Sequence, residues 1–404
     1  MTQTLVSLLL IMIAATLAPI VVSVIPRVHI PSVIVEIALG IVIGPQLLGW
    51  VHMNQILAAL SDLGLAFLFF LAGFEIDLNR IKGRPLTLGG LGWVISLVIA
   101  FAIAIPLTIT GTLQAPEFVA LAMATTTKGT LIPILRDTGE MTSRFGAFVL
   151  GAGVVGEFGP IVVIAVVLDQ VRKPLFSAII LDLFILGVVA MIVVARKWRP
   201  AHIERLLSAT MHSSAQLAIR ITIVILLIFI FAAVRLGLEF LLGAFAAGAV
   251  VAQFVRQWEG PREDDLKALE TKYEGIGFGL LIPIFFVVSG VTFDLHALEN
   301  APIALLIVPV FLLLFLLVRG LPVMILYRRD LSAAERWPLA LFCATQLPLV
   351  ITITDLGVAD HKMTELLATC MVAAAMLSVL VFPVIAATQR ARYKSDRLRS
   401  HLKA

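Results

Sequence analysis

The stretch Gly151-Ala-Gly-Val-Val-Gly-Glu-Phe-Gly-Pro160 places an acidic side chain, Glu157, inside a long apolar run. Lys128 and Arg319 lie in equally apolar sequence elsewhere in the chain. A charged group is costly at the centre of a bilayer, and ionisable residues there usually mark ion or proton pathways. One buried acid and two buried bases therefore indicate an ion pathway.

The composition supports a membrane location for this run. Hydrophobic residues make up 60% of the 404 residues, charged residues make up 14%, and the mean hydropathy is +1.06. Such a chain is not a soluble globular protein. Each membrane-spanning helix needs about 20 apolar residues, because its backbone must satisfy its own hydrogen bonds. The sequence predicts an all-α integral membrane protein of about 13 transmembrane helices.

The positions of the basic residues predict the orientation. Most of the 30 Lys and Arg residues fall in the odd-numbered connections and in the C-terminal tail. Cytoplasmic loops carry such an excess, so the N-terminus is expected outside and the C-terminus in the cytoplasm. The pI near 9.2 has the same origin and predicts no nucleic-acid partner. The basic tail suits anionic lipid headgroups.

The sequence contains no pattern typical of a membrane enzyme. It has no Ser with a His partner, no His-Glu-x-x-His spacing and no paired aspartates in facing helices. The tail leaves no room for a nucleotide-binding domain, so we predict no cofactor. A transporter is therefore favoured over an enzyme.

An internal repeat relates the two halves of the chain. The residues that recur at constant spacing are Phe69, Gly73, Asp77 and Leu78 in the first half and Phe286, Gly290, Asp294 and Leu295 in the second. The predicted orientation makes the paired helices run in opposite senses. This pattern is typical of an inverted-topology repeat, in which substrate binds near the bilayer midplane between interrupted helices.

Two segments are candidates for such interruptions. The first is Thr125-Thr-Thr-Lys-Gly-Thr130 and the second is Ala344-Thr-Gln-Leu-Pro-Leu-Val350. Proline removes a backbone hydrogen bond, and a glutamine side chain can satisfy groups that a break leaves unpaired. Two ordinary proline kinks are the alternative interpretation. The residues concerned are Gly129 in the first segment, Pro133 just after it, and Gln346 and Pro348 in the second segment.

Several runs, in order along the chain, resemble the monovalent cation:proton antiporter superfamily in its bacterial potassium-efflux and sodium/proton exchanger branch (KefC-like and NapA-like). They are Leu63–Leu78, Gly40–Pro45, Pro133–Gly139, Gly151–Pro160 and Phe285–Gly290. The resemblance implies an NhaA-like fold of thirteen helices with two broken, crossing helices. It also implies a homodimer, an elevator-like core and a bacterial cytoplasmic membrane location.

The resemblance also implies a division of the chain into functional parts. Scaffold helices and core helices alternate, with a linker between the halves and a tail at the end. The expected parts are scaffold helices in residues 1–84, core helices in 85–170, a linker in 171–212, scaffold helices in 213–298, core helices in 299–388 and the basic tail in 389–404.

By this resemblance, Glu157 takes the position of the family's ion-binding aspartate, and Arg319 that of a buried base near it. The family usually has Asp, Asn or Gln before the key carboxylate, but this chain has Gly156. With one carboxylate, exchange of Na⁺ or K⁺ for H⁺ is expected to be electroneutral. Main-chain carbonyls and the hydroxyls of Thr126 or Thr127 would complete the oxygen shell. A buried acid locked to Arg319 for packing alone is the structural alternative.

Lys128 replaces a small hydroxyl residue of the family pattern. An ammonium group at membrane depth either pairs with a carboxylate or loses its proton. In one scheme Lys128 pairs with Glu157, and a cation breaks the pair and releases a proton. In the rival scheme Lys128 replaces the cation permanently, and the protein is a proton-coupled transporter of an anion or a small organic solute.

Replacing Lys128 by Thr separates these schemes. The Lys128→Thr variant should show disturbed proton coupling if the ammonium exchanges a proton with the cation. It should show stronger cation exchange if the ammonium replaces the cation. Proton flux into proteoliposomes on addition of Na⁺ or K⁺ measures both effects, and unchanged flux would count against both schemes.

Overall fold

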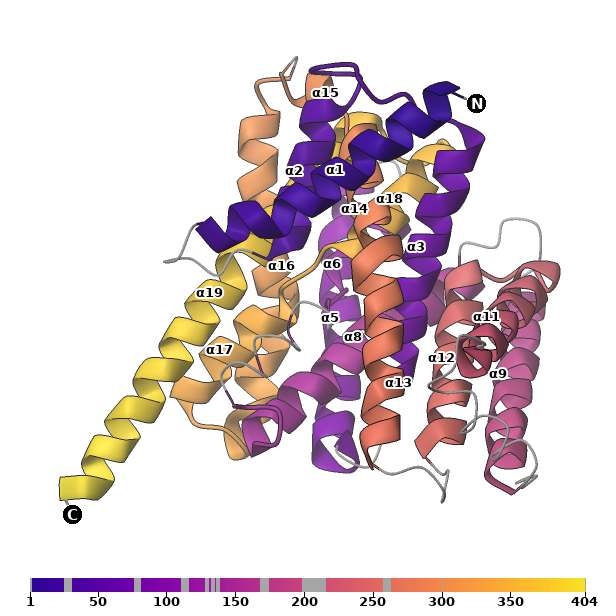
Figure 1. Cartoon of the computed structure of the whole chain (residues 1–404). Helices are drawn as coiled ribbons and strands as arrows, with labels where there is room; N and C mark the ends of the chain where they lie inside the picture. The colour runs from indigo at the N-terminus through magenta and orange to yellow at the C-terminus, as the bar shows by residue number, and fades with distance from the viewer. Residues whose placement is uncertain are drawn as a thin grey trace. The chain divides into compact units, whose positions relative to one another are not determined.

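Helices form every regular element in the described part of the chain (Figure 1). The computed structural model describes residues 2–24, 31–75, 81–109, 116–127, 131, 135, 139–167, 174–197, 216–256, 263–299 and 301–403. Within these ranges, nine helices are long and apolar enough to cross a membrane. Shorter apolar helices cover Ser32–Ile43, Ile179–Val194 and Phe240–Arg256. The predicted all-α membrane architecture is confirmed, and the count of thirteen helices stays a prediction.

The chain forms two compact units. The first comprises residues 1–12, 53–76 and 161–288, and the second comprises residues 13–52, 77–160 and 289–404. The first contains α3 (Gln55–Phe74), α9 (Pro174–Lys197), α11 (Leu217–Arg235), α12 (Phe240–Arg256), α13 (Glu263–Ile276) and the π-helix η1 (Gly277–Leu281). The second contains α2 (Ser32–Ile43), α5 (Arg84–Ile109), α6 (Pro116–Met123), α15 (Leu295–Glu299), α16 (Ala304–Leu326), the 3₁₀-helix η2 (Tyr327–Arg329), α17 (Ala333–Cys343), α18 (Pro348–Ala359) and α19 (Glu365–Lys403). Three helices contribute to both units: α1 (Thr2–Val24), α8 (Arg144–Val167) and α14 (Ile282–Thr292).

Glycines let α3 and α12 approach closely in the first unit. A Cβ atom on Gly73 would overlap the carbonyl oxygen of Phe245, and one on Gly248 would overlap that of Phe70. Small residues at helix interfaces are the usual means of close packing within membranes, where apolar contacts with lipid compete with contacts between helices. The second unit uses the same device, because a Cβ on Gly290 would overlap the carbonyl oxygen of Ile37.

Close packing also joins α5 to α8 in the second unit. A Cβ on Gly89 would lie 2.7 Å from the carbonyl oxygen of Gly151, and one on Gly151 would lie 2.8 Å from that of Pro85. The two backbones therefore meet with almost no side chain between them. This contact fixes the helix that carries Glu157.

An ion-pair cluster fixes the connection between α16 and α17. Asp330 has a side chain that is only 5% exposed, and it accepts hydrogen bonds from Arg84 Nε at 2.7 Å and Arg84 Nη2 at 2.5 Å. Arg144 Nη2 lies 3.4 Å from Asp330 Oδ1. The hydrogen bonds from Arg84 hold the pKa of Asp330 below its ordinary value. The starts of α5 and α8 are thus tied to one carboxylate.

A second cluster ties α19 to the start of α17. Arg390 Nε donates to Glu140 Oε1 at 2.8 Å, and Arg390 Nη1 donates to Glu335 Oε1 at 3.1 Å. Glu335 also forms a capping box with Ser332 at the N-terminus of α17. Arg390 therefore fixes this helix start through the residue that caps it.

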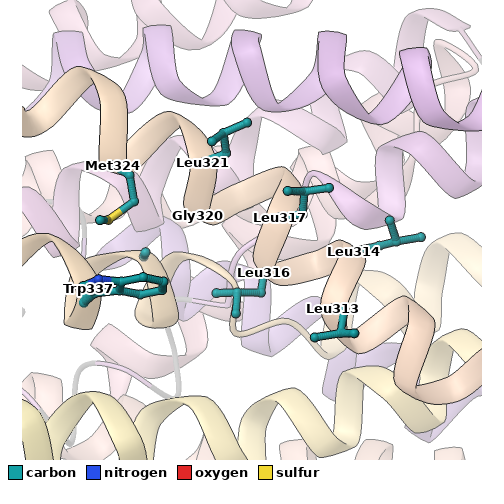
Figure 2. A pocket seen from close by; sticks show the side chains of 9 residues that line it. Leu313, Leu314, Leu316, Leu317, Gly320, Leu321, Met324 and Trp337 are labelled. Atoms are coloured by element: carbon teal, nitrogen blue, oxygen red, sulfur yellow. The ribbon is translucent and has the colours of Figure 1, made fainter.

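An apolar groove of about 420 Å³ lies between α16 and α17 (Figure 2). Its lining includes Leu313, Leu317, Gly320 and Trp337, and the Trp337 residue is 50% exposed. The lining offers hydrocarbon and one aromatic ring, which suit lipid chains and give a bare ion no oxygen ligands.

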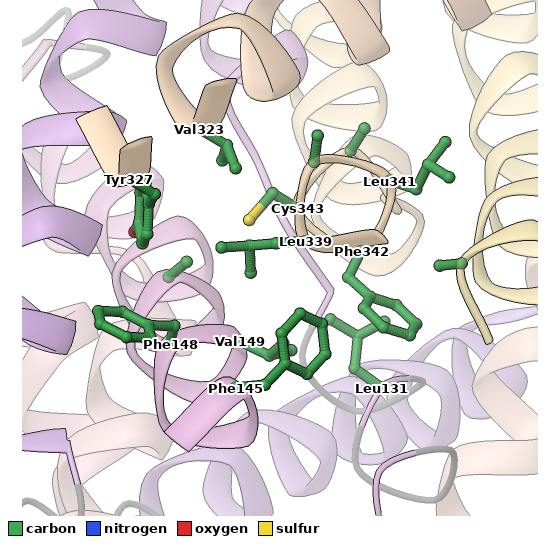
Figure 3. Close-up of a cluster of buried hydrophobic side chains, with 14 of the residues drawn as sticks. Leu131, Phe145, Phe148, Val149, Val323, Tyr327, Leu339, Leu341, Phe342 and Cys343 are labelled. Carbon is green, nitrogen blue, oxygen red and sulfur yellow. The ribbon is translucent and has the colours of Figure 1, made fainter. Parts of the chain in front are cut away.

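A cluster of buried aromatic and aliphatic side chains joins α8, α16 and α17 (Figure 3). Phe148 packs edge-on against Tyr327 with ring centroids 5.5 Å apart, and Phe145 lies 6.3 Å from Phe342. Leu339 is fully buried among them. This cluster holds the three helices together.

Neighbouring glycines on α5 give a matched test of the helix packing. Gly89→Ala should lower the free energy of unfolding by about 1–3 kcal/mol, because the new methyl group overlaps the backbone of α8. Gly90→Ala meets no atom within 4 Å and should be neutral or slightly stabilising, by up to about 1 kcal/mol. Thermal unfolding of the two variants in the same detergent measures the difference, and equal unfolding temperatures would contradict this packing.

Candidate functional site

The chain leaves helical geometry at both predicted breaks. Helix α6 ends at Met123 and is followed by non-helical residues 125–127, while α17 ends at Cys343 and α18 begins at Pro348. β-Branched threonines in the first segment and the proline in the second favour these interruptions. The N–H and carbonyl groups at the ends of these helices then need hydrogen-bond partners other than bulk water.

The two broken segments provide these partners for each other. The Thr127 N–H donates to the carbonyl oxygen of Thr345 at 2.8 Å, and the Leu347 N–H donates to Thr127 Oγ1 at 2.9 Å. Thr126 Oγ1 donates to the carbonyl oxygen of Cys343 at 2.5 Å. The first break is therefore hydrogen-bonded directly to the second, within one compact unit.

Side chains from neighbouring positions satisfy further backbone groups at the breaks. Gln346 Nε2 donates to the carbonyl oxygen of Met123 at 2.9 Å, and Trp93 Nε1 donates to that of Ala124 at 3.1 Å. Ser378 Oγ accepts the Gln346 N–H and donates to the Gln346 carbonyl oxygen, each at 3.0 Å. Each of these helix-end groups thus has an internal partner, as a membrane interior requires.

Glu157 lies on α8 immediately next to the first break. The Thr126 N–H donates to the carbonyl oxygen of Gly156 at 3.0 Å, which fixes α8 against the broken segment. The Glu157 residue is 6% exposed. An acid that is buried beside interrupted helices is a candidate site for proton or cation exchange.

Arg319 is held by uncharged oxygens. Its Nε lies 2.9 Å from Thr126 Oγ1 and 3.4 Å from the carbonyl oxygen of Cys343. Its Nη1 donates to Ser96 Oγ at 3.2 Å, and Nη2 lies 3.5 Å from the carbonyl oxygen of Ala152. The residue is 3% exposed. These contacts join the guanidinium to α5, α8 and both broken helices.

Gly156 leaves the space that the guanidinium occupies. A Cβ on Gly156 would lie 2.6 Å from Arg319 Nη2 and 2.7 Å from both Cβ and Oγ1 of Thr126. Both distances are shorter than ordinary contacts between heavy atoms, so a side chain here would displace Arg319 or the broken helix. The glycine that departs from the family pattern is therefore matched by an arginine packed against it.

The structure brings most of the predicted site residues together. Direct hydrogen bonds or packing contacts connect residues on α8, α16 and both breaks, and Glu157 directly follows Gly156 in this group. Lys128, Gly129 and Pro133 lie outside the described residues. The roles assigned to all of these residues stay predictions. The connected residues are Thr126, Thr127, Gly156, Arg319 and Gln346, with Pro348 at the start of α18.

Three polar side chains of the site were not predicted from the sequence. Ser96, Ser378 and Trp93 are single polar groups in long apolar helices, and each contacts a residue at the breaks or Arg319. A hydroxyl group in a membrane helix also bonds to its own backbone, as Ser96 does to the carbonyl oxygen of Gly92. The only sequence signal was therefore polarity at membrane depth.

These features define a class of protein. Membrane helices with a buried acid beside two paired helix breaks are typical of secondary transporters. The family model described as "Sodium/hydrogen exchanger, transmembrane" matches residues 11–388, and the chain belongs to this family. The predicted membership of the monovalent cation:proton antiporter superfamily is thereby confirmed. It is a family of transporters, which fits the expectation that this protein is not an enzyme.

Individual relatives carry related names. The chain is 25% identical to the putative Na⁺/H⁺ antiporter YjbQ of Bacillus subtilis over 94% of its own length and 62% of that protein. It is 30% identical to the Na⁺/H⁺-K⁺ antiporter GerN of Bacillus cereus over 65% of its length and 66% of that protein. The chain thus spans less than two thirds of the length of each. A Na⁺/H⁺ antiporter of Enterococcus hirae is 27% identical over 73% of the chain and 75% of that protein.

A solved structure has the same fold. The sodium proton antiporter MjNhaP1 from Methanocaldococcus jannaschii, determined at pH 8, superposes with a TM-score of 0.67. The match covers 97% of both chains at 17% sequence identity. At this identity the match shows the fold alone.

Substitution of Gly156 tests its packing against Arg319. Gly156→Ala should lower the free energy of unfolding by about 1–3 kcal/mol, because the methyl group overlaps the guanidinium and Thr126. Combining it with Arg319→Lys should cost less than the sum of the single changes, because lysine frees part of this space. Thermal unfolding of the two single variants and the double variant measures the coupling.

Gly187→Ala on α9 is the matched control, because its new Cβ meets no atom within 4 Å. Additive losses in the double variant, or a Gly156→Ala loss no larger than that of the control, would contradict the proposed packing.

Proposed function

We propose that this protein exchanges a monovalent cation, Na⁺ or K⁺, for H⁺ across the membrane, with Glu157 as the shared binding group. The family and the names of its relatives support this class of transport. The observation that carries the proposal is the buried carboxylate on α8 beside two broken helices that are hydrogen-bonded to each other. A proton and a cation compete for that carboxylate.

Neutral oxygens would supply the remaining cation ligands. Among the described residues, no three His, Cys, Asp or Glu side chains gather at a common site. Thr126 Oγ1 donates to the carbonyl oxygen of Cys343 and accepts from Arg319, so one of its two lone pairs remains available. Thr127 and main-chain carbonyls of the breaks are further candidates. A hard cation prefers such oxygens.

The charge balance supports electroneutral exchange. Arg319 keeps its positive charge in both loaded states, since a guanidinium does not deprotonate in proteins. Binding either one proton or one monovalent cation to Glu157 then gives the same net charge. Moving equal charges in opposite directions does no net work against the membrane potential, which otherwise contributes about 2.3 kcal/mol per charge at 100 mV.

An elevator-type movement with a homodimeric scaffold is the mechanism that we propose. The described residues of the site all belong to the second compact unit, which supports transport by a unit that carries its site with it. An inverted repeat of thirteen helices would provide the two equivalent states. The distribution of Lys and Arg supports an outside N-terminus and a cytoplasmic C-terminus in a bacterial inner membrane.

Lys128 supports a second candidate function. If its ammonium group replaces the bound cation, the same site would serve a proton-coupled transporter of an anion or a small organic solute. Cation-dependent proton flux distinguishes the two functions, because a site already filled by an ammonium group gives no response to alkali cations.

Proteoliposomes with a trapped pH dye test the exchange directly. Adding Na⁺, K⁺ or Li⁺ outside should change the internal pH, whereas choline should not. Glu157→Gln should abolish the response, because a neutral amide cannot exchange a proton for a cation. Clamping the membrane potential should leave the wild-type rate unchanged.

The Glu157→Gln protein should elute and unfold like the wild type, which separates loss of transport from loss of folding. Full flux in this variant would overturn the site assignment. A wild-type protein that responds to none of the cations would favour the anion or solute transporter.

A further inference from the structure

The two polar atoms of the Gln346 side chain have different surroundings. Nε2 donates to the carbonyl oxygen of Met123, whereas Oε1 is buried and has no hydrogen-bond partner in the part of the chain that the structure describes. The residue is 0% exposed. Rotating the amide by half a turn would place Oε1 against the Met123 oxygen, so the orientation follows from the contacts.

The unpaired oxygen contrasts with its neighbours. The Gln346 N–H and carbonyl group both bond to Ser378, the Leu347 N–H bonds to Thr127, and Thr345 Oγ1 donates to the carbonyl oxygen of Leu341. A buried acceptor without a donor costs about 1–3 kcal/mol. Within the described residues, an unsatisfied oxygen among bonded neighbours calls for an explanation, and a bound ion is one.

Short hydrogen-bonded steps connect Gln346 to the acid. Residues Thr345 and Leu347, on either side of Gln346, both bond to Thr127. The backbone N–H of Thr126 donates to the carbonyl oxygen of Gly156, the residue just before Glu157. Both steps lie within the second compact unit. The residues on either side of Gln346 are therefore hydrogen-bonded to the same broken segment as the helix that carries Glu157.

We propose that Gln346 Oε1 is a neutral oxygen ligand of the transported cation, an inference that rests on the exchange function proposed above. An amide oxygen is a suitable ligand for a hard cation. A proton on Glu157 needs no such ligand. Gln346 therefore stabilises the cation-loaded site and leaves the proton-loaded site unchanged.

This difference has two consequences. Without this ligand the cation binds more weakly, while the binding of a proton to Glu157 does not change. The half-saturating cation concentration therefore rises, and the pH dependence of exchange moves to higher pH. Because the amide is neutral, the charge moved in each cycle does not change. Gln346 thus sets affinity and ion preference, while Glu157 determines the coupling.

Gln346→Met tests the proposal, because methionine has a similar length and no amide oxygen. Proton flux in proteoliposomes is measured over a range of Na⁺, K⁺ and Li⁺ concentrations. The half-saturating concentration should rise about tenfold for at least one cation, equivalent to about 1.4 kcal/mol. The maximal rate and the insensitivity to membrane potential should be retained.

Thr354→Val on α18 is the matched control. It removes a buried hydroxyl that donates to the carbonyl oxygens of Val350 and Ile351 in its own helix, and it leaves Gln346 unchanged. Its half-saturating concentrations should stay close to those of the wild type. An equal rise in both variants, or no rise in Gln346→Met, would overturn the ligand role and assign Gln346 to structural support of the break.

Cation binding gives a readout that does not depend on transport. Na⁺ or K⁺ should raise the unfolding temperature of the wild type in detergent, because a ligand that binds only the folded state stabilises it. Gln346→Met should need a higher cation concentration for the same rise, and an identical dependence would overturn the proposal.

If Gln346→Met does not fold, Gln346→Glu decides, because it replaces the amide oxygen by a carboxylate oxygen. Gln346→Glu should lower the half-saturating cation concentration, since a charged oxygen ligand binds a cation more tightly, whereas an unchanged concentration would contradict a ligand role. A wild type without any cation-dependent flux or stabilisation refutes the exchange function itself, and the ligand role with it.

Discussion

The structure depends on satisfying backbone hydrogen bonds where two membrane helices are interrupted. In hydrocarbon an unpaired N–H or carbonyl group costs several kcal/mol, and no bulk water is available to replace its partner. The two breaks meet this constraint by hydrogen-bonding to each other. The Thr127 N–H donates to the Thr345 carbonyl oxygen, and the Leu347 N–H donates to Thr127 Oγ1. Helix α8 is attached to the same centre through Thr126, and α16 through Arg319. The position of Glu157 is a consequence of these bonds.

Composition and local pattern predicted the class of fold and the location of both breaks, because hydropathy and proline act on their own segment. The partners in the site were not predictable in the same way. Thr126 bonds to Cys343, and Arg319 bonds to Ser96, through contacts that only the folded chain creates. At the first break, α6 has only 8 residues and is too short to span a membrane by itself.

The absence of a side chain at Gly156 affects both the packing and the charge of the site. The family pattern has a polar or acidic residue here, whereas in this chain the guanidinium of Arg319 lies where a Cβ would begin. A second carboxylate at this position would add a negative charge to the centre and would also displace the arginine. Its absence thus preserves a positive charge that is held by neutral oxygens. The packing of one glycine and the charge of the loaded site are therefore not independent.

A site built in this way can separate ion preference from coupling. In the proposed exchange, coupling depends on how many charges Glu157 exchanges, and the neutral oxygens of the breaks do not change that number. Preference depends on how many of those oxygens reach the ion, since a bare cation needs a shell of ligands and a proton needs one. Because the oxygens belong to segments fixed by their own hydrogen bonds, small changes at Thr126, Thr127 or Gln346 would alter the shell without altering the charge carried. Under the proposed mechanism, the ion preference of this site could therefore change while one proton is still exchanged for each cation.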